Sequence, residues 1–266
     1  MYFLVQAAKR YIGLGSNALK SLIPGYFNKV SYSLFYRKSP FLSSFSPLNV
    51  SGLIGWLKAD SIIGLSDGDP VTTWLGSVGG NNATQSTTAN KPTYKVNIIN
   101  GLPVVRFDGI DDYMDMNIHT LIPQPCTYFM VCKSSTWQAM IIDSTAGNRN
   151  LIQSAFDPGP ENHEVNLYAG TGPIAGTQPM STTNALLISV IFNSANSKSW
   201  LNGVLDVNQD IGNLNLGGGP RIGASIVPGT FLAGDIAEVL IYDSAINDSN
   251  RISIQNHLIS KYAISL

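Results

Sequence analysis

The chain has 266 residues, of which 44 % are hydrophobic and only 12 % are charged. That share of charge is about half the usual one, so Ser, Thr, Asn and Gly must supply the solvated surface, and these residues favour turns and polar strand faces over helices. The composition therefore excludes a protein of long helices rich in Glu and Lys, and the length allows one large sandwich or two small domains.

The charges are divided unevenly along the chain. Residues 1–58 contain seven basic side chains and no acid, whereas the remainder holds nine basic and all seventeen acidic side chains, a net charge of −8. The same opening segment contains ten of the twenty-one Tyr and Phe residues. The overall charge of −1 thus conceals a basic, aromatic arm over residues 1–50 joined to an acidic domain over residues 51–266.

Within the arm, Gln6–Leu22 could form a short helix that ends at Pro24-Gly25, and Ser31–Tyr36 alternates as an extended strand would. A secretory signal needs basic residues before its apolar core, but here Tyr2–Val5 precedes Lys9-Arg10. No stretch approaches the roughly 20 apolar residues that span a bilayer. We therefore expect neither a signal peptide nor a membrane segment.

The arm has several interpretations, and we favour an assembly arm that lies on a neighbouring protein. Its aromatic residues are too many for a disordered tail, and aromatic and cationic side chains are enriched at interface hot spots. An arm that only packs on its own domain is the main alternative; a transit peptide fits in part, and nucleic-acid binding is not expected because the acidic body would repel phosphates. The expected partner-binding residues are Lys9, Arg10, Lys20, Tyr26, Phe27, Lys29, Phe35, Tyr36, Arg37 and Lys38.

The body is a series of short strands separated by turn residues. The pattern predicts strands at 104–107, 113–116, 128–131, 139–142, 165–168 and 185–192, the last apolar enough to be buried on both faces. Asn202-Gly203 between Trp200-Leu201 and Val204-Leu205 is the strongest hairpin signal. Cys126 and Cys132 are six residues apart in one predicted strand, about 20 Å at ~3.3 Å per residue, so we expect two buried thiols and no disulfide.

The chain ends in a strand and then a helix. Ile236, Val239 and Ile241-Tyr242 form a β-branched and aromatic run, and Asn247-Asp248-Ser249 supplies residues that favour helix N-caps. Ile254, Leu258 and Tyr262 then recur every four residues, with Ile252 and Ile259 beside them, which predicts one apolar helical face. Many strands followed by a single helix indicate an all-β sandwich closed by a C-terminal helix.

This ending, together with three other passages, resembles the laminin-G-like, concanavalin A-like jelly-roll domains of bacteriophage virion proteins. The passages are Gly55–Asp60 with Gly64–Trp74, Asn81–Tyr94 with Asn100–Tyr113, and Trp200–Leu205. The resemblance covers about residues 53 to 264. It implies an all-β, concanavalin A-like jelly-roll sandwich of two antiparallel sheets with one C-terminal helix, preceded by the extended N-terminal arm.

The resemblance also implies a place in a virus particle. We expect a virion structural protein, assembled in the host cytoplasm, and first of all a capsid decoration or cement protein that is docked by its arm with the jelly roll displayed outside. A tail fibre or baseplate component is the nearest alternative. The expected partners are a capsid or other virion protein and further copies of this chain in a dimer or trimer, with no nucleic acid and no membrane.

A lectin module for host-surface glycans is the alternative from another functional class, and exposed Trp137 or Trp74 stacking on sugar would distinguish it. We do not expect an enzyme. His119, His163 and His257 lie far apart without metal-ligand spacing. Glu161 and Glu164 fall in a loop, and Glu238 stands alone among the carboxylates of its predicted strand.

No cofactor is expected. The resemblance raises the chance of calcium at two groups of loop carboxylates, Asp67 and Asp69 in the first and Asp108, Asp111 and Asp112 in the second. However, Asp-Gly pairs are ordinary turn residues. We therefore assign no metal ligands.

Overall fold

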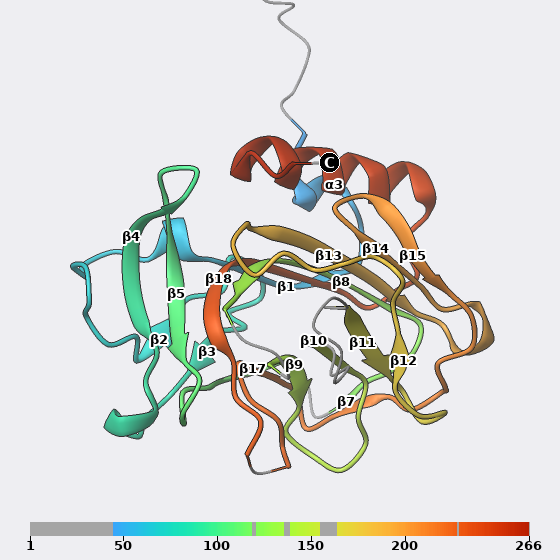
Figure 1. Ribbon diagram of the computed structural model, residues 1–266, viewed down its shortest axis with the longest axis horizontal. Coiled ribbons are helices and arrows are strands. Elements are labelled where there is room, and N and C mark those ends of the chain that lie inside the picture. The colour runs from blue at the N-terminus through green and yellow to red at the C-terminus, as the bar shows by residue number, and fades with distance from the viewer. Residues whose placement is uncertain (1–44, 119–120, 136–138, 155–163, 228, 266) are drawn as a thin grey trace, which may run out of the picture. The chain divides into compact units, whose positions relative to one another are not determined.

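The computed structural model describes residues 45–118, 121–135, 139–154, 164–227 and 229–265. These belong to a compact unit that runs from Phe45 to Leu266. The predicted arm helix, arm strand and all ten predicted arm-binding residues lie outside the described residues. Within them, the expected all-β sandwich of two antiparallel sheets and one C-terminal helix is confirmed (Figure 1).

The first sheet, sheet A, carries the helix on its outer face (Figure 1). All its strand pairs are antiparallel. Its order is β15, β14, β13, β8, β18, β5 and β4, with β1 also pairing to β18. The bounds are β15 Val204–Asn208, β14 Lys198–Leu201, β13 Leu186–Phe192, β8 Cys126–Ser134, β18 Ala233–Tyr242, β5 Leu102–Asp108, β4 Thr93–Ile99 and β1 Leu53–Lys58.

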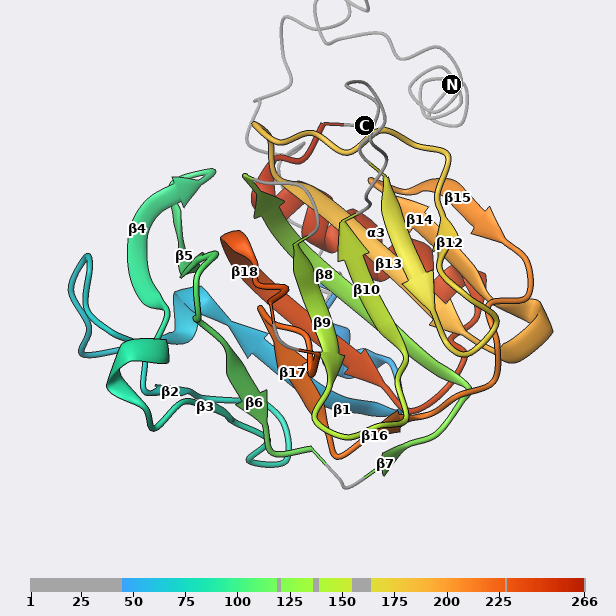
Figure 2. The ribbon, with the colours of Figure 1, turned by 60° about the horizontal axis from the view of Figure 1, so that its bottom comes forward.

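The second sheet, sheet B, lies across the core from sheet A and comes forward in Figure 2. Its order is β12, β11, β10, β9, β17, β6, β3 and β2. The bounds are β12 Ile174–Ala175, β11 Val165–Tyr168, β10 Leu151–Ser154, β9 Met140–Ser144, β17 Pro220–Ile222, β6 Met114–Met116, β3 Ala83–Thr84 and β2 Thr73–Trp74. A small third sheet pairs β16 (Leu216–Gly217) with β7 (Leu121–Ile122).

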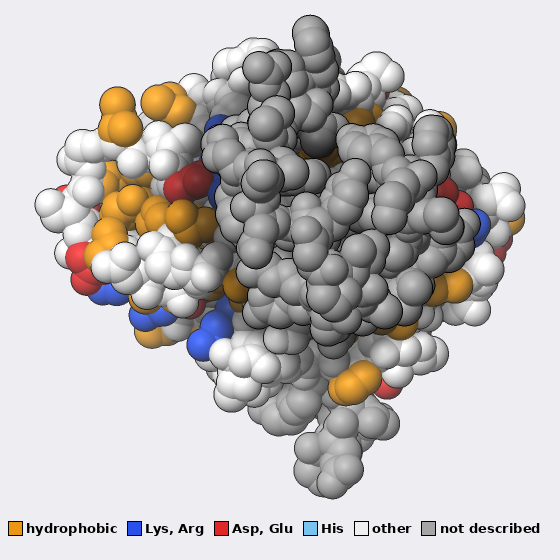
Figure 3. Space-filling view, turned by 90° about the horizontal axis from the view of Figure 1, so that it is seen from above, with side chains coloured by type: hydrophobic (Ala, Val, Ile, Leu, Met, Phe, Trp, Pro, Cys, Tyr) orange, Lys and Arg blue, Asp and Glu red, His pale blue; other side chains and the backbone are white. Residues whose placement is uncertain are grey.

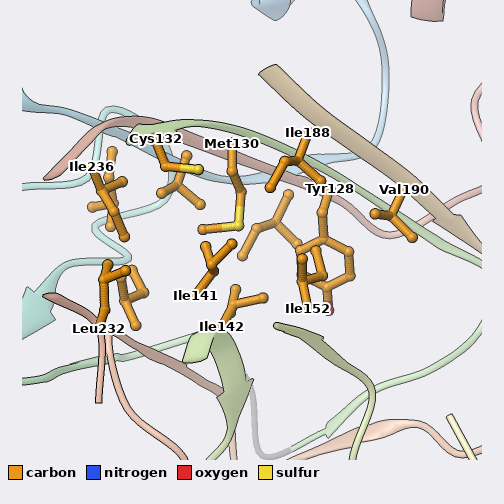
Figure 4. Close-up of a cluster of buried hydrophobic side chains, with 14 of the residues drawn as sticks. Tyr128, Met130, Cys132, Ile141, Ile142, Ile152, Ile188, Val190, Leu232 and Ile236 are labelled. Carbon is orange, nitrogen blue, oxygen red and sulfur yellow. The ribbon is translucent and has the colours of Figure 1, made fainter. Parts of the chain in front are cut away.

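The main core lies between the two sheets. Tyr128, Met130 and Cys132 point inward from β8 at alternate positions, and Ile141 and Ile152 meet them from sheet B (Figure 4). This is the period-2 pattern of a strand with one face on a core. Cys126 and Cys132 are both buried and free, as expected, and burial raises the pKa of each thiol to about 12.

The hairpin predicted at Asn202-Gly203 is confirmed between β14 and β15. Both residues have positive φ, +50° and +87°, which is the requirement of a primed turn that favours Asn-Gly. β13 is buried along its whole length, also as predicted. Local sequence signals therefore specify this part of sheet A.

The long strand β18 contains a bulge at Ala237. Ile236 is opposite Cys132 of β8, but Glu238 is opposite Val131, so one residue is extra. Ile236 and Val239 both face the inter-sheet core, whereas Ala237 and Leu240 face the helix. The bulge shifts the alternation by one residue, and Glu238 consequently points toward the helix and away from the main core.

The C-terminal helix α3 (Asp248–Tyr262) covers one half of the outer face of sheet A. It begins as predicted, because the Asn247 side chain accepts a hydrogen bond from the N–H of Asn250 at 2.9 Å. Ile254, Leu258 and Tyr262 are buried against the sheet. Ile252 is 46 % exposed, so its predicted place on the apolar face is wrong; two residues before Ile254, it lies about 200° away around the helix.

Residues 45–50, which the sequence groups with the arm, pack on the sandwich. A short 3₁₀ helix η2 (Pro47–Asn49) is held by a hydrogen bond from the Tyr242 hydroxyl to the Pro47 carbonyl, 3.1 Å long. The rings of Phe45 and His257 meet edge to face. No helix among the described residues is long and apolar enough to cross a bilayer.

Candidate functional site

A hollow of about 580 Å³ lies over the ends of the central strands of sheet A. Its lining is drawn from β4, β5, β8 and β18 and from the 89–91 and 112 loop positions: Ala89, Lys91, Thr93, Arg106, Phe107, Asp108, Asp112, Lys133, Ser135, Ala233, Gly234 and Asp235. In the space-filling view toward the helix side, acidic and basic side chains lie beside hydrophobic ones on the described surface (Figure 3). A charged hollow of this size is the kind of concavity in which small ligands bind.

The floor of the hollow is a row of polar side chains across four strands. Thr93 is opposite Arg106, Arg106 is opposite Asp235, and Asp235 is opposite Lys133. The neighbours of these residues on the side of the helix point into the core. They are Val105 on β5, Ile236 on β18 and Cys132 on β8. The row therefore lies on the outer face of sheet A, the same face that α3 covers farther along the strands.

Arg106 and Asp235 form the strongest contact in the hollow. The Nε and Nη2 atoms of Arg106 donate to the two carboxylate oxygens of Asp235 at 2.6 and 2.9 Å. This bidentate geometry fixes both side chains, and the hydrogen bond raises the pKa of Arg106. The pair has one free guanidinium nitrogen, Nη1, which neither bond uses.

Acidic side chains form one rim. The carboxylate Oδ1 of Asp108 accepts the N–H groups of Ile110 and Asp111 at 2.8 and 3.3 Å, and Oδ2 of Asp112 accepts the N–H of Asp108 at 2.9 Å. Burial, reinforced by the neighbouring carboxylates, raises the pKa of Asp112 to about 6. The amide of Asn90 donates to the Asp111 carbonyl and so attaches the adjacent wall to this rim.

Two lysines and a serine complete the polar lining. Ser135 donates its hydroxyl to the Ala233 carbonyl at 2.7 Å. The ammonium groups of Lys91 and Lys133 form no ion pair or hydrogen bond with another residue of the described part of the chain. Gly234 lets β18 lie close to β8 beneath them, because a Cβ atom there would collide with the Lys133 carbonyl.

The two groups of aspartates suggested for calcium have structural roles. Asp67 accepts from the Lys95 ammonium and the Val96 N–H, which lowers its pKa, and Asp69 accepts from the Ser66 N–H. Carboxylate oxygens of Asp108, Asp111 and Asp112 lie within 4.8 Å of one another. Calcium takes six to eight oxygens, and oxygens of this cluster already hold backbone N–H groups, so we assign no metal to it.

Glu238 belongs to the helix-covered half of the sheet. It is fully buried and accepts from the Trp56 indole at 2.6 Å, the Lys261 ammonium at 2.7 Å and the Tyr262 hydroxyl at 2.8 Å. Lys261 also reaches Asp60 at 3.0 Å. These contacts attach the end of α3 to β18 and β1, and they leave Glu238 without a role in the hollow.

Of the other residues considered in the sequence analysis, Trp74 and His257 are described by the structure. Trp74 is fully buried, so the expectation that it could stack on a sugar is wrong. His257 is half-buried on α3, and burial lowers its pKa. The ten arm residues, His119, His163, Trp137 and Glu161 lie outside the described residues.

The sequence did not reveal that the hollow exists. Arg106, Lys133 and Asp235 come from three strands that are far apart in the chain. A detectable signal was the placement of a charged residue near one end of each of three apolar strands. Their alignment in one row depends on strand register, which the sequence does not state.

No family model matches the chain, and no curated protein matches it. Among solved structures, Trypanosoma rangeli sialidase in complex with 2,3-difluoro-KDN is similar with a TM-score of 0.56 and 10 % identity, over 82 % of this chain and 34 % of the sialidase. An arabinofuranosidase complexed with arabinofuranosyl-alpha-1,2-xylobiose is similar with a TM-score of 0.56 and 12 % identity, over 73 % of this chain and 51 % of that one. At these identities the likeness shows the fold.

The expectation that the chain is not an enzyme is contradicted by these matches. The two similar structures reported above are a sialidase and an arabinofuranosidase, so the fold occurs within enzymes that act on carbohydrates. The chain spans about a third of the length of the sialidase and about half that of the arabinofuranosidase. The coarser part of the sequence resemblance, an all-β sandwich of the jelly-roll type, is what the comparisons support.

Proposed function

We propose that the sandwich is a carbohydrate-recognition module that binds its glycan in the charged hollow. The observation that carries the proposal is the lining itself, in which carboxylates, cations and a hydroxyl converge on about 580 Å³. Sugars present many hydroxyl groups, each able to donate and accept a hydrogen bond, and carboxylates and cationic donors are strong partners for them. The size lies within the range of small-ligand pockets.

The similar structures give further support. The sialidase and the arabinofuranosidase were each solved in complex with a sugar ligand, so proteins that contain this sandwich act on carbohydrates. Because fold and activity separate readily, this support is secondary to the hollow. For this chain, the carbohydrate-directed activity of these longer proteins is a proposal.

The test is binding of the full-length chain to a glycan array and then titration with the glycans retained. Ala89, exposed at the rim of the hollow, is replaced in the variant Ala89→Trp, which fills the hollow without removing a hydrogen bond. Ala175, exposed on β12 of the other sheet, gives the matched control Ala175→Trp. We expect Ala89→Trp to weaken binding at least tenfold and Ala175→Trp to leave it unchanged.

Two results would overturn the proposal: an array on which the full chain retains no glycan, or binding that Ala89→Trp does not weaken. Release of reducing sugar is measured on the same glycans, because the carboxyl of Asp112, whose pKa is raised to about 6, lies beside other carboxylates. Glycosidases use pairs of carboxyl groups as acid and base or as acid and nucleophile. Hydrolysis that Asp112→Asn abolishes would extend recognition to catalysis.

The second candidate is a virion structural protein of the laminin-G-like phage type, which we propose from the sequence resemblance and the charge division. Residues 1–58 carry seven basic side chains and no acid, while the remainder has a net charge of −8. An acid-free, aromatic arm is suited to an acidic protein surface. The proposal is a capsid decoration protein, with a tail fibre or baseplate component as its alternative, and display on a particle is compatible with glycan recognition.

Electron microscopy of particles labelled at the C-terminus of the chain tests the second candidate. Label over the shell supports a decoration protein, label at the tail supports the alternative, and particles without label contradict both. In the full chain, replacing Lys9, Arg10, Lys20, Lys29, Arg37 and Lys38 by Gln should weaken attachment, while a control with Lys91, Lys95 and Lys133 replaced should not.

A further inference from the structure

The distribution of charge in the hollow indicates which class of sugar it takes, on the condition that the proposed glycan recognition is correct. Along the floor, Arg106 and Lys133 flank Asp235 on either side. Side chains that are directly opposite on one face have Cβ atoms about 4.5–5.5 Å apart. The three groups thus form a continuous plus–minus–plus row across β5, β18 and β8.

The central acid of this row is neutralised by one neighbour only. Both carboxylate oxygens of Asp235 accept from Arg106, and the Asp235 side chain is just 5 % exposed. Lys133 forms no ion pair within the described residues, although it is next to Asp235. Its ammonium therefore remains available, as does the Nη1 atom of Arg106.

Lys91 adds a second available ammonium from the wall formed by the 89–91 loop. The acids of the hollow lie beside this wall, because Asn90 donates to the Asp111 carbonyl. Oδ2 of Asp108 and Oδ1 of Asp112 are not used in hydrogen bonds with described residues. The row across β5, β18 and β8 thus offers the cationic donors of Arg106 and Lys133, and the rim beside it offers carboxylate acceptors. This separation suits a ligand that carries one negative charge and several hydroxyl groups.

We propose that the hollow binds an acidic sugar, with the sugar carboxylate at Lys133 and the free Nη1 of Arg106 and with ring hydroxyls donating to Asp108 and Asp112. Charge-assisted hydrogen bonds form at both ends of such a ligand. A neutral sugar satisfies only the acidic rim and leaves the ammonium groups unpaired. A sugar with several sulfate groups fits less well, because the rim carboxylates repel additional negative charge.

The test is isothermal titration of the full-length chain with matched sugars that differ in the carboxylate. The probes are methyl glucuronide against methyl glucoside, methyl galacturonide against methyl galactoside, and N-acetylneuraminate alone. We expect at least one acidic sugar to bind tenfold or more tightly than its neutral counterpart, or N-acetylneuraminate to bind where the neutral sugars do not. The affinity should fall as salt rises, since one charged contact is screened.

Lys133→Gln should remove most of the preference for the acidic sugar, roughly a tenfold loss, and leave binding of the neutral sugar unchanged. Lys198→Gln is the matched control, because Lys198 is also a half-buried strand lysine of sheet A, on β14 and outside the hollow. Thermal unfolding of both variants establishes that they are folded. Lys133→Glu, which reverses the charge, should abolish binding of the acidic sugar.

The outcomes separate this inference from the proposed function. Equal affinity for acidic and neutral sugars, lost in Ala89→Trp, overturns the acidic-sugar inference and leaves glycan recognition intact. A preference that Lys133→Gln and Lys133→Glu do not change overturns the assignment of the carboxylate to this end of the hollow. No binding of any sugar, here and on the array, overturns both proposals.

Discussion

The outer face of sheet A has two halves with opposite character. Along β18, Ala237, Leu240 and Tyr242 lie beneath α3. The one carboxylate beside them, Glu238, has three donors. Residues Ala233 to Asp235 of the same strand form the floor of the charged hollow. One strand thus supports a sealed interface at one end and an accessible polar hollow at the other, which teaches that a single strand can combine a packed surface with an open one.

If the helix half is responsible for stability, Glu238→Ala should have the largest effect. It leaves the Trp56 indole, the Tyr262 hydroxyl and the Lys261 ammonium without their shared acceptor, and removing one partner of a buried charged network costs about 3–5 kcal/mol. We expect the free energy of unfolding in urea to fall by about that amount. Glu238→Gln retains an acceptor and should cost less, and a loss below about 1 kcal/mol for Glu238→Ala would contradict the described role.

On the hollow half, the Arg106–Asp235 pair should contribute less. Arg106→Ala leaves the buried carboxylate of Asp235 without two hydrogen bonds, while the arginine side chain itself is 42 % exposed. We expect a loss of about 1–2 kcal/mol in unfolding free energy. A double-mutant cycle with Asp235→Ala measures the coupling between the two side chains, and a coupling near zero would show that the pair is not formed in solution.

The rim of the hollow should respond to pH through Asp112. The pKa of Asp112 is raised from 3.8 to about 6 by burial, so its contribution to stability is fully present below pH 3.8 and is lost as the pH rises through about 6. The free energy of unfolding of the wild type should therefore fall, relative to that of Asp112→Asn, between pH 3.8 and about 6. Above about pH 6 the difference between the two proteins should stay constant. Urea unfolding of both proteins at half-unit steps of pH measures this; a constant difference would contradict the raised pKa.

The smallest expected effect on stability is that of Lys133→Gln. Lys133 has no ion pair among the described residues, so the unfolding free energy should change by no more than about 0.5 kcal/mol. Lys95→Gln is the control at an exposed pair, because it removes the 2.6 Å contact with Asp67 and should cost up to about 1 kcal/mol. A large destabilisation by Lys133→Gln would show that Lys133 stabilises the fold. It would contradict the view that the helix half of sheet A contributes more to stability than the hollow half.

Local features of the fold were predictable from the sequence. The Asn202-Gly203 turn and the Asn247 cap depend on the conformations of a few neighbouring residues, so a short stretch of sequence is enough to predict them. The alternation of Tyr128, Met130 and Cys132 likewise reports a strand face. Ile252 shows the limit of such reasoning, because counting apolar residues without their angular positions placed an exposed side chain on the buried face.

The candidate site was not predictable in the same way. Arg106 and Asp235 are 129 residues apart, and their contact depends on the register of β5 against β18. That register is set by tertiary packing and not by any short motif. Ile236 and Val239 both face the core although they are three residues apart, and this spacing results from the bulge in β18. The sequence alone does not reveal the bulge, because apolar residues three apart are also common in regular strands that are buried on both faces.

The bulge at Ala237 has a consequence for protein engineering. Because the extra residue resets the alternation of side chains, the segment before it and the segment after it have separate phases along one backbone. Positions 233 and 235, together with their cross-strand neighbours on β5 and β8, could then be randomised in a combinatorial library without altering which residues of 238–242 meet the helix. The sandwich in this sense resembles an antibody framework, with a constant portion and a variable portion joined at a single residue.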